Sequence, residues 1–337
     1  MAKIALTGIK PTGTPHIGNY LGMIKPAIEL VQSFRALYFI ADYHALTTER
    51  DPEKLNCQTY EVAATWLALG LDPDKVVFFR QSDIPEVFEL TWILACLTSK
   101  GLLNRAHAYK TAVEENIRQK RSADDNINAG IFGYPVLMAA DILLFGTHVV
   151  PVGQDQKQHV EIARDIASSF NSNYGNVFTI PDVLVREDVM SVPGLDGRKM
   201  SKTYRNTIPI FADDKVIRRQ VMGIVTDSKP PEAPKDPESC NLFSLYRYFA
   251  PREALMKTRA AYLKGARYND IKKELVELLL DKFKEGRRTY EAFLQDKPAI
   301  ERILKQGAET ARSIAKPLLT KVRLRIGINR TEILQKP

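Results

Sequence analysis

Short apolar segments alternate with amphipathic segments up to about residue 205. Four apolar segments are rich in β-branched and aromatic residues, as expected of strands buried on both faces. They are 3–9, 35–42, 75–80 and 147–153. Four segments have helical periodicity or helix start and stop signals, namely 19–31, 52–70, 85–97 and 155–170. Strands that alternate with helices form a parallel sheet covered by helices, so we predict an α/β fold.

The pattern changes after about residue 205, where strand-like runs fade and charged segments with helical periodicity, such as 269–286, take over. The segment 226–240 contains four prolines, which predicts a surface loop or linker. A chain of 337 residues exceeds the usual size of one hydrophobic core. We therefore expect two domains, 1–205 and 206–337. The second is mainly helical, and its last helix could pack back on the first.

Composition narrows the class of protein only partly. The formal net charge of +8 suits a polyanionic partner, but a basic balance alone is a weak indication. Cys57, Cys96 and Cys240 are far apart and lack zinc-like spacing, so we expect reduced thiols. The chain has neither a secretory h-region at its start nor an apolar run long enough to cross a membrane, which predicts a cytoplasmic protein with no membrane partner.

The segment PTGTPHIGNYLG, residues 11–22, lies between the first predicted strand and the helix that follows it. At such a crossover, free backbone N–H groups and the helix dipole favour phosphate binding, and glycines permit close approach. The segment matches neither the dinucleotide-binding nor the P-loop fingerprint. A lone loop histidine such as His16 is usually a solvated side chain or a local hydrogen-bond partner, and this segment alone favours that interpretation.

A second polar segment, LDGRKMSKTYRN at 195–206, places Lys199 and Lys202 on one loop. Two lysines there can hold a triphosphate and follow the charge that develops as pyrophosphate leaves. A basic solvated loop is the better explanation of the pair when it is considered alone. Together, however, HIGN and KMSKT resemble the paired signatures of the class I aminoacyl-tRNA synthetases, both in order and in separation.

This resemblance implies a Rossmann-like catalytic domain, ATP with Mg²⁺, and no metal held by the protein itself. It implies catalytic roles for His16, Asn19, Lys199 and Lys202. The matching ATP-binding positions are Lys10, Gly18, Gly153, Asp155, Lys199, Met200, Ser201 and Lys202. Asn19 and Thr203 depart from the usual histidine and serine, but both retain hydrogen-bonding groups. Lys10 replaces a glutamine common in relatives, and we expect it to add a cation near the phosphates or the substrate carboxylate.

The segment 133–167 carries the specificity argument. In a helix over 134–145, Tyr134, Met138 and Asp141 share one face of an otherwise apolar element. A buried aspartate needs a donor, and a core partner or a cap could supply it. An apolar ring with a single N–H would fit the same surroundings, and indole is such a ring. The carboxylate would then reject rings that lack this donor.

YPVLMAADILL and VPVGQDQKQHVEIARDIA closely resemble the bacterial tryptophanyl-tRNA synthetases. The resemblance implies that Asp141 reads the indole N–H, with Tyr134, Met138, Val150 and Val152 around the ring. Gln156 would join Tyr134 at the α-ammonium, and His44 would line the pocket. The implied reaction forms tryptophanyl-adenylate from L-tryptophan and ATP, then transfers the tryptophanyl group to tRNA(Trp). A homodimer and a C-terminal region that recognises the anticodon are also implied.

Several alternatives stay open at this point. A tyrosyl-tRNA synthetase shares both signatures, although the VGQDQKQH context disfavours it. A catalytically idle tRNA-binding paralogue and a small nucleotidyltransferase are the other two classes. The segment 104–130 reads as a mobile loop over the site or as a surface helix, and the choice of an ATP contact among Lys110, Lys120 and Arg121 is open. Basic residues in 216–228 could meet tRNA or simply face solvent.

Overall fold

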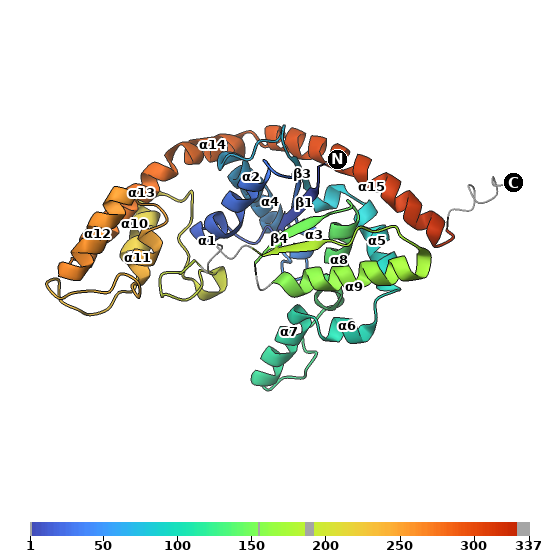
Figure 1. Ribbon diagram of the computed structural model, residues 1–337, viewed down its shortest axis with the longest axis horizontal. Helices are drawn as coiled ribbons and strands as arrows, with labels where there is room; N and C mark the ends of the chain where they lie inside the picture. The colour runs from blue at the N-terminus through green and yellow to red at the C-terminus, as the bar shows by residue number, and fades with distance from the viewer. Residues whose placement is uncertain (1, 154–155, 186–191, 329–337) are drawn as a thin grey trace.

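The computed structural model describes residues 2–153, 156–185 and 192–328, and a five-stranded parallel sheet lies at its centre (Figure 1). The strand order is β3-β2-β1-β4-β5. The strands are β1 (Ile4–Ile9), β2 (Arg35–Ile40), β3 (Val77–Arg80), β4 (Val149–Val152) and β5 (Asp182–Val185). The order reverses between β1 and β4. In open parallel sheets, ligands bind in the crevice beyond the carboxyl ends of the strands at such a point.

The four predicted strands all form, slightly shorter than predicted. The prediction missed β5, because its four residues follow Pro181 and begin with an exposed aspartate, Asp182. So short a segment offers too few apolar positions for its pattern to stand out. The α/β fold with a parallel sheet is confirmed.

Helices cover both faces of this sheet. Those of the first part of the chain are α1 (Ile17–Asn19), α2 (Lys25–Leu30), α3 (Asp42–Ala45), α4 (Pro52–Ala68), α5 (Glu86–Ala95), α6 (Lys100–Asn104), α7 (His107–Arg118), α8 (Ala129–Leu143) and α9 (Lys157–Tyr174). α4, α5 and α9 confirm three of the predicted helices. Because β1 alternates its side chains, Leu6 packs with α5, α8 and α9, and Ile9 packs with α2 and α4 on the opposite face.

The predicted helix at 19–31 is interrupted. A π-helical turn, η1 (Tyr20–Ile24), lies between α1 and α2. Pro26 follows this turn, and a proline inside a regular α-helix lacks an N–H and clashes with the carbonyl four residues earlier. The wider π-turn avoids this conflict, and it places Gly22 and Met23 beside the cavity described below.

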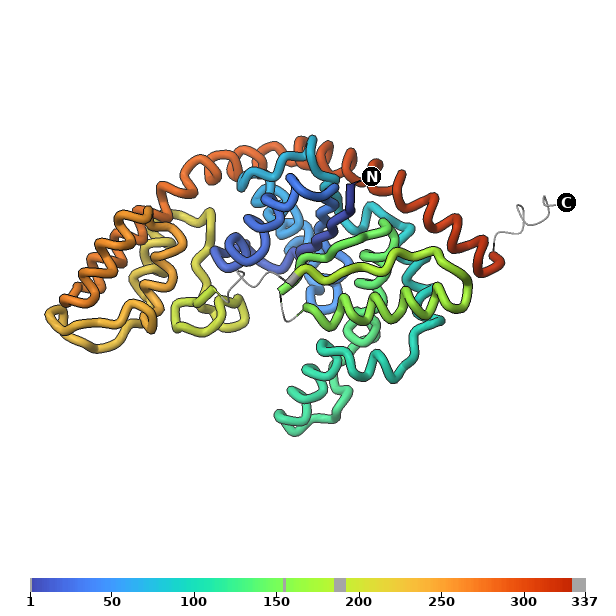
Figure 2. The backbone as a smooth tube through the Cα atoms, viewed as in Figure 1, coloured from blue at the N-terminus to red at the C-terminus, as the bar shows by residue number. Residues whose placement is uncertain are grey.

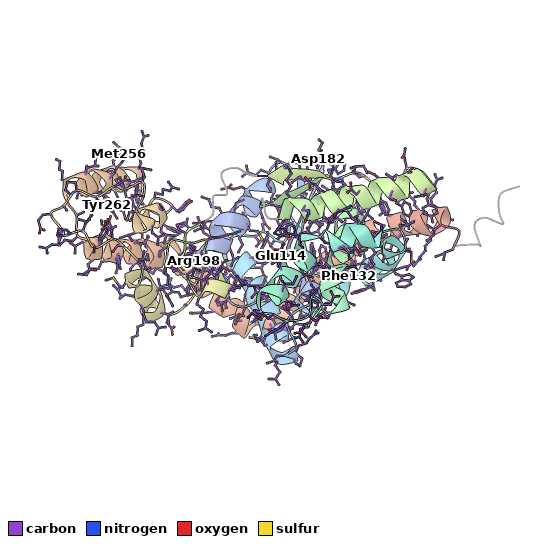
Figure 3. The ribbon with its side chains drawn as sticks, turned by 90° about the horizontal axis from the view of Figure 1, so that it is seen from below. Glu114, Phe132, Asp182, Arg198, Met256 and Tyr262 are labelled. Carbon is purple, nitrogen blue, oxygen red and sulfur yellow. The ribbon has the colours of Figure 1, made fainter. Side chains whose placement is uncertain are left out.

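The C-terminal part is helical, as the pattern after residue 205 predicts. Its helices are α10 (Asp214–Met222), α11 (Asn241–Tyr246), α12 (Arg252–Lys264), α13 (Tyr268–Lys282), α14 (Lys284–Gln295) and α15 (Lys297–Arg325). On α12, Tyr262 is buried and Met256 is exposed, and the labels of these two residues in Figure 3 show where α12 lies. Within the described ranges, no helix is both long enough and apolar enough to cross a membrane.

The core around α10–α13 also takes in residues that precede 205. Ile17, Tyr20, Val192 and Met200 are buried in it, together with side chains of α11 and α13. The two signature segments are thus anchored in the core of the C-terminal helices. The division of the chain at residue 205 stays a prediction.

The last helix, α15, packs against β3 and α5, and Figure 2 shows α14 and α15 as an arch across the top of the molecule. Gly307 lies so close to β3 that a Cβ there would come within 1.8 Å of the Phe78 carbonyl oxygen. Ion pairs join Arg80 to Glu301 at 2.6 Å and Arg312 to Glu86 at 2.9 Å. α15 therefore ties the C-terminal helices to the edge of the sheet that carries β3.

Candidate active site

A cavity of about 310 Å³ opens at the carboxyl ends of β1 and β4, where the strand order reverses. It brings together all seven residues that the sequence associates with the amino acid, and two associated with ATP. These are Lys10, His44, Tyr134, Met138, Asp141, Val150, Val152, Gly153 and Gln156. We call it the first cavity. Its walls also include Leu6, Gly8 and Phe39, so a few polar groups lie among apolar surface, as is typical of a small-molecule site.

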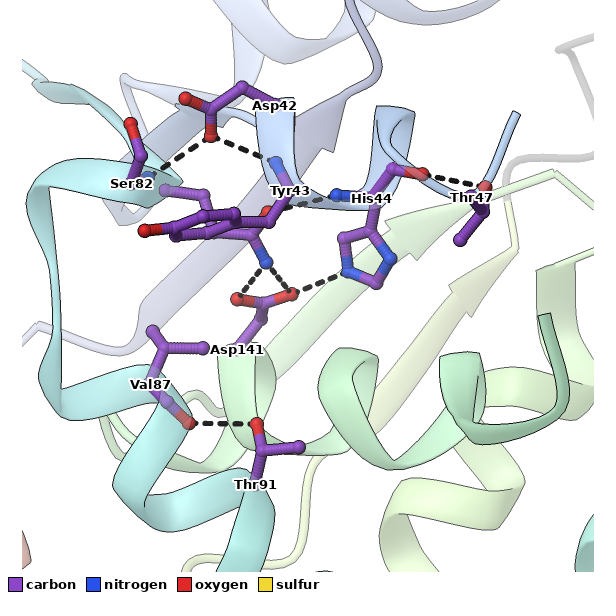
Figure 4. Close-up of polar contacts among 9 residues, drawn as sticks. Asp42, Tyr43, His44, Thr47, Ser82, Val87, Thr91 and Asp141 are labelled. Atoms are coloured by element: carbon purple, nitrogen blue, oxygen red, sulfur yellow. Dashed lines mark hydrogen bonds and ion pairs between the residues drawn. The ribbon is translucent and has the colours of Figure 1, made fainter. Parts of the chain in front are cut away.

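Asp141 is the buried acceptor of the first cavity, with 2% of its surface exposed. Its carboxylate accepts hydrogen bonds from the Gln81 amide nitrogen at 2.8 and 2.9 Å, one to each oxygen. His44 Nε2 lies 2.8 Å from Asp141 Oδ2 (Figure 4). Burial raises the pKa of Asp141, and the hydrogen bonds from His44 and Gln81 oppose this rise. Gln81 and His44, which lie on other elements, are thus the donors that this buried aspartate needs.

Gln81 is a site residue that the sequence analysis missed. It begins the 3₁₀ turn η2 (Gln81–Asp83), directly after β3, and is fully buried. An amide at the carboxyl end of a predicted strand lies where ligands bind in such folds, which is the signal that could have identified it.

Lys10 lies in the first cavity rather than among the signature loops. Its ammonium nitrogen is 5.6 Å from the centre of the Tyr134 ring, a cation–π distance, and donates to Thr47 Oγ1 at 3.3 Å. Burial lowers the pKa of Lys10. Asn128, which caps the start of α8, donates to the Thr47 carbonyl at 3.0 Å. Lys10 is thus held beside the N-terminal turns of the helix that carries Tyr134 and Asp141.

The two signature segments meet at a second cavity of about 540 Å³. It is lined by Thr12, His16, Gly18, Asn19, Lys199, Met200, Ser201, Lys202, Thr203 and Tyr204. The Gly18 N–H points to Met200 Sδ at 3.3 Å, and the ammonium of Lys202 donates to the carbonyls of Thr12 and Gly13. The structure therefore joins two segments that are about 180 residues apart. Among the described residues, no group of three or more His, Cys, Asp or Glu could hold a metal.

His16 caps the start of the short helix α1, and Asn19 is the last residue of that helix. The Asn19 side-chain oxygen accepts from the His16 backbone N–H at 3.1 Å, which leaves the amide nitrogen of Asn19 as its donor group. His16 is buried, and burial together with the nearby Lys202 charge lowers its pKa to about 4. His16 is consequently neutral at pH 7. Burial of the Lys202 ammonium lowers the pKa of that lysine to about 8.

Asn206, another residue missed from the sequence, fixes the shape of the KMSKT segment. Its side chain is buried, accepts from the Ser201 N–H at 2.8 Å and donates to the Lys199 carbonyl at 3.2 Å. It also donates to Asp196 at 2.7 Å. A Cβ on Gly194 would lie 2.3 Å from Asn206, so glycine is needed for this close packing. Its position just after KMSKT is the only sequence signal for this role.

Two predictions about ATP contacts, Asp155 and a basic residue of 104–130, are not settled by the structure. Asp155 lies outside the described residues. The segment 104–130 contains the surface helix α7 and a return loop, which together project from the molecule in Figure 1. On it, Lys110 approaches Glu114 at 3.7 Å and Arg121 approaches Asp125 at 3.9 Å, both at the exposed surface. The surface-helix interpretation is confirmed for α7, and the choice of an ATP contact in this segment stays open.

The comparisons with known proteins agree with this geometry. Residues 2–295 match the family model described as tRNA synthetases class I (W and Y). The chain is 49% identical to the tryptophan–tRNA ligase of Pseudomonas aeruginosa over 331 residues, which is 96% of this chain and 73% of that protein. The chain belongs to the class I tryptophan–tRNA ligases. The corresponding ligase of Xanthomonas campestris is 47% identical over 97% of this chain and 77% of its own length.

Solved structures of tryptophan–tRNA ligases have the same fold. The crystal structure of the Campylobacter jejuni enzyme, complexed with ADP and tryptophan, has a TM-score of 0.88 and 46% identity, covering 96% of this chain and 99% of that chain. A tyrosyl-tRNA synthetase from Archaeoglobus fulgidus, at a TM-score of 0.64 and 17% identity, shares the fold alone. The predicted family, fold and ATP-dependent ligase activity are therefore confirmed, and the tyrosyl alternative is set aside.

Proposed function

We propose that the two cavities divide the substrates of the tryptophan–tRNA ligase reaction. The first cavity takes L-tryptophan, and the second takes the phosphates of ATP. The observation that carries this proposal is the placement of a buried acceptor, Asp141, in one cavity and of two lysines, Lys199 and Lys202, in the other. An apolar ring with one N–H suits the former, and a polyphosphate suits the latter.

In the first cavity, the Asp141 carboxylate accepts the indole N–H. Tyr134, Met138, Val150 and Val152 surround the ring, and Gln156 and Tyr134 meet the α-ammonium group. His44 orients Asp141 through its 2.8 Å contact. An analogue without the N–H leaves the buried carboxylate with an unmade hydrogen bond, which disfavours its binding.

Lys10 pairs with the tryptophan carboxylate. Its ammonium lies beside Tyr134 in the first cavity, which supports this assignment over a contact with the phosphates. A half-buried ammonium attracts an anion more strongly than one in water, because solvent screening is weaker there. The substrate carboxylate is also the group that must face ATP. Lys10 would therefore position the nucleophile.

ATP lies between the cavities, with its ribose near Gly153 and Asp155 and its phosphates near Gly18, Met200 and Ser201. A carboxylate oxygen of tryptophan attacks the α-phosphorus, and the bond to the pyrophosphate oxygen breaks. Neutral His16 and Asn19 donate hydrogen bonds, and Lys199 and Lys202 stabilise charge on the departing pyrophosphate. Mg²⁺ enters as the ATP complex. The described residues that line the second cavity include no carboxylate that could bind it.

In the second step, a hydroxyl of the terminal ribose of tRNA(Trp) attacks the acyl carbon and AMP leaves. The helical region 206–337 meets the anticodon, and basic residues on α10 such as Arg218 and Arg219 are candidates for phosphate contacts. Phosphate contacts weaken steeply as salt concentration rises. Cytoplasmic location, which the sequence also predicts, stays a prediction.

The active form is a homodimer. Trp92, with 73% of its surface exposed, and Phe88, with 43%, lie one turn apart on α5. Leu46, which directly follows α3, is also exposed. Tyr43 on α3 packs edge-on against Phe88, with 4.4 Å between the two ring centroids. Large aromatic side chains gathered at the surface are typical of interface cores. Sedimentation of the protein without substrates tests this surface. We expect the mass of a dimer for the native chain and the mass of a monomer for Trp92→Asp.

Amino-acid-dependent exchange of labelled pyrophosphate into ATP tests the proposed function. The assay compares tryptophan, tyrosine and phenylalanine without tRNA. We expect strong exchange with tryptophan and background exchange with the other two. Equal exchange with phenylalanine would overturn the assignment of Asp141, and absence of exchange with any of the three would overturn the assignment of the second cavity.

A further inference from the structure

Gln81 connects three elements around the first cavity. From the carboxyl end of β3, its amide nitrogen donates to both oxygens of Asp141 on α8. Its amide oxygen accepts from the His44 backbone N–H on α3 at 3.4 Å. The side chain is fully buried, so its polar atoms are satisfied by these protein contacts instead of by water. One amide thus fixes the relative positions of the two residues that face the substrate.

The hydrogen bonds distinguish the two oxygens of Asp141. A carboxylate oxygen accepts about two hydrogen bonds. Among the described contacts, Oδ2 accepts from both Gln81 and His44, whereas Oδ1 accepts from Gln81 only. Oδ1 therefore retains acceptor capacity for one further donor.

We infer that Gln81 is a positioning residue for tryptophan selection, which orients the Asp141 carboxylate so that Oδ1 accepts the indole N–H. The inference rests on the proposed role of Asp141. Gln81 does not touch the reacting atoms and acts through Asp141. Without its amide donor, the Asp141 carboxylate is held by His44 alone, at Oδ2, and the position of Oδ1 is no longer fixed. The buried anion also loses one of its two donors.

The backbone around Gln81 holds this amide in place independently of the substrate. The Ser82 N–H, next in the chain, donates to Asp42 Oδ1 at 3.0 Å, and Asp42 Oδ1 also accepts from the Tyr43 N–H at 3.0 Å (Figure 4). Asp42 thus ties the end of β2 to the turn that carries Gln81. The position of the amide is set before tryptophan arrives, as an effective recognition site requires.

The test compares exchange kinetics with tryptophan and with an analogue whose ring carries sulfur in place of the N–H. Gln81→Met keeps the side-chain length and removes the donor, and Gln81→Leu removes the donor with a shorter apolar side chain. In both variants we expect the kcat/KM ratio of tryptophan to analogue to fall at least about tenfold. The loss should lie in the KM for tryptophan, with the KM for ATP unchanged. Gln58→Met, the same chemical change on α4, should keep the wild-type ratio.

Asp141→Asn, measured in parallel, separates the role of Gln81 from that of Asp141. A wild-type ratio in both folded Gln81 variants, with a collapsed ratio in Asp141→Asn, would overturn the role of Gln81 and leave that of Asp141. A wild-type ratio in Asp141→Asn would overturn the proposed recognition and the inference together. An equal rise in the KM for ATP and for tryptophan in the Gln81 variants would indicate a general structural role, which contradicts the inference.

Discussion

Two residues of the second cavity, His16 and Lys202, have pKa values below their ordinary ones. Burial and the Lys202 charge lower the pKa of His16 to about 4, and burial lowers the pKa of Lys202 to about 8. His16 is therefore a neutral hydrogen-bond donor at physiological pH, and Lys202 is the group whose charge changes just above it. A neutral imidazole beside a cation avoids repulsion and still binds a phosphate oxygen.

The pH profile of the exchange reaction follows from these values. Because kcat/KM reports ionisations of the free enzyme, we expect kcat/KM for ATP to fall above about pH 8, as Lys202 loses its proton. Lys202→Arg should move this loss to higher pH, since a guanidinium stays charged. No loss should occur between pH 7 and pH 5 from His16, whose pKa is about 4. A profile that is flat to pH 10 in the native chain would contradict the role of Lys202.

Some residues of the site could be predicted from the sequence and others could not. Asp141, Tyr134 and Met138 lie on one helix, so their common face follows from helical spacing. Gln81 and Asn206 escape such reasoning. The partner of Gln81 is 60 residues away on another element, and its role depends on how β3 is placed against α8. Spacing along the chain carries no information about that placement.

At the scale of elements, the strands and most helices follow from local patterns, whereas of the last helix, α15, we expected only that it could pack back on the first domain. Its apolar stripe predicts a buried face but not which surface buries it. The structure places it on β3, with Gly307 against the Phe78 backbone and Arg80 paired to Glu301. β3 leads directly into Gln81, so this helix supports the segment that orients Asp141.

Gly307→Ala tests this close packing. The new Cβ would lie 1.8 Å from the Phe78 carbonyl oxygen and 2.5 Å from its carbon, so the backbone of β3 or α15 must move. We expect a loss of about 3 kcal/mol in the free energy of unfolding, measured by urea denaturation. Gly101→Ala, on α6 with no atom within 4 Å of its added Cβ, should be neutral or slightly stabilising. Equal stability of the two variants would show that α15 can shift freely.

At the scale of the whole molecule, the active site joins two cores. The first cavity lies over the parallel sheet, whereas the signature loops are anchored through Ile17 and Met200 in the core of the C-terminal helices. The Ile17 N–H donates to the Ile208 carbonyl at 2.9 Å, which fixes the start of α1 to the chain beyond residue 205. Under the proposed assignment, the amino acid and the phosphates therefore meet where the two cores adjoin.

The central claim, that one cavity selects tryptophan and the other acts on the phosphates, is tested most directly by exchange kinetics and tryptophan binding of Asp141→Asn and Lys199→Ala. Asp141→Asn should weaken tryptophan binding and leave the KM for ATP near that of the native chain. Lys199→Ala should lower kcat by at least about a hundredfold and leave tryptophan binding unchanged, because its charge acts on the departing pyrophosphate. Equal losses of tryptophan binding and kcat in both variants would contradict the division of substrates between the cavities.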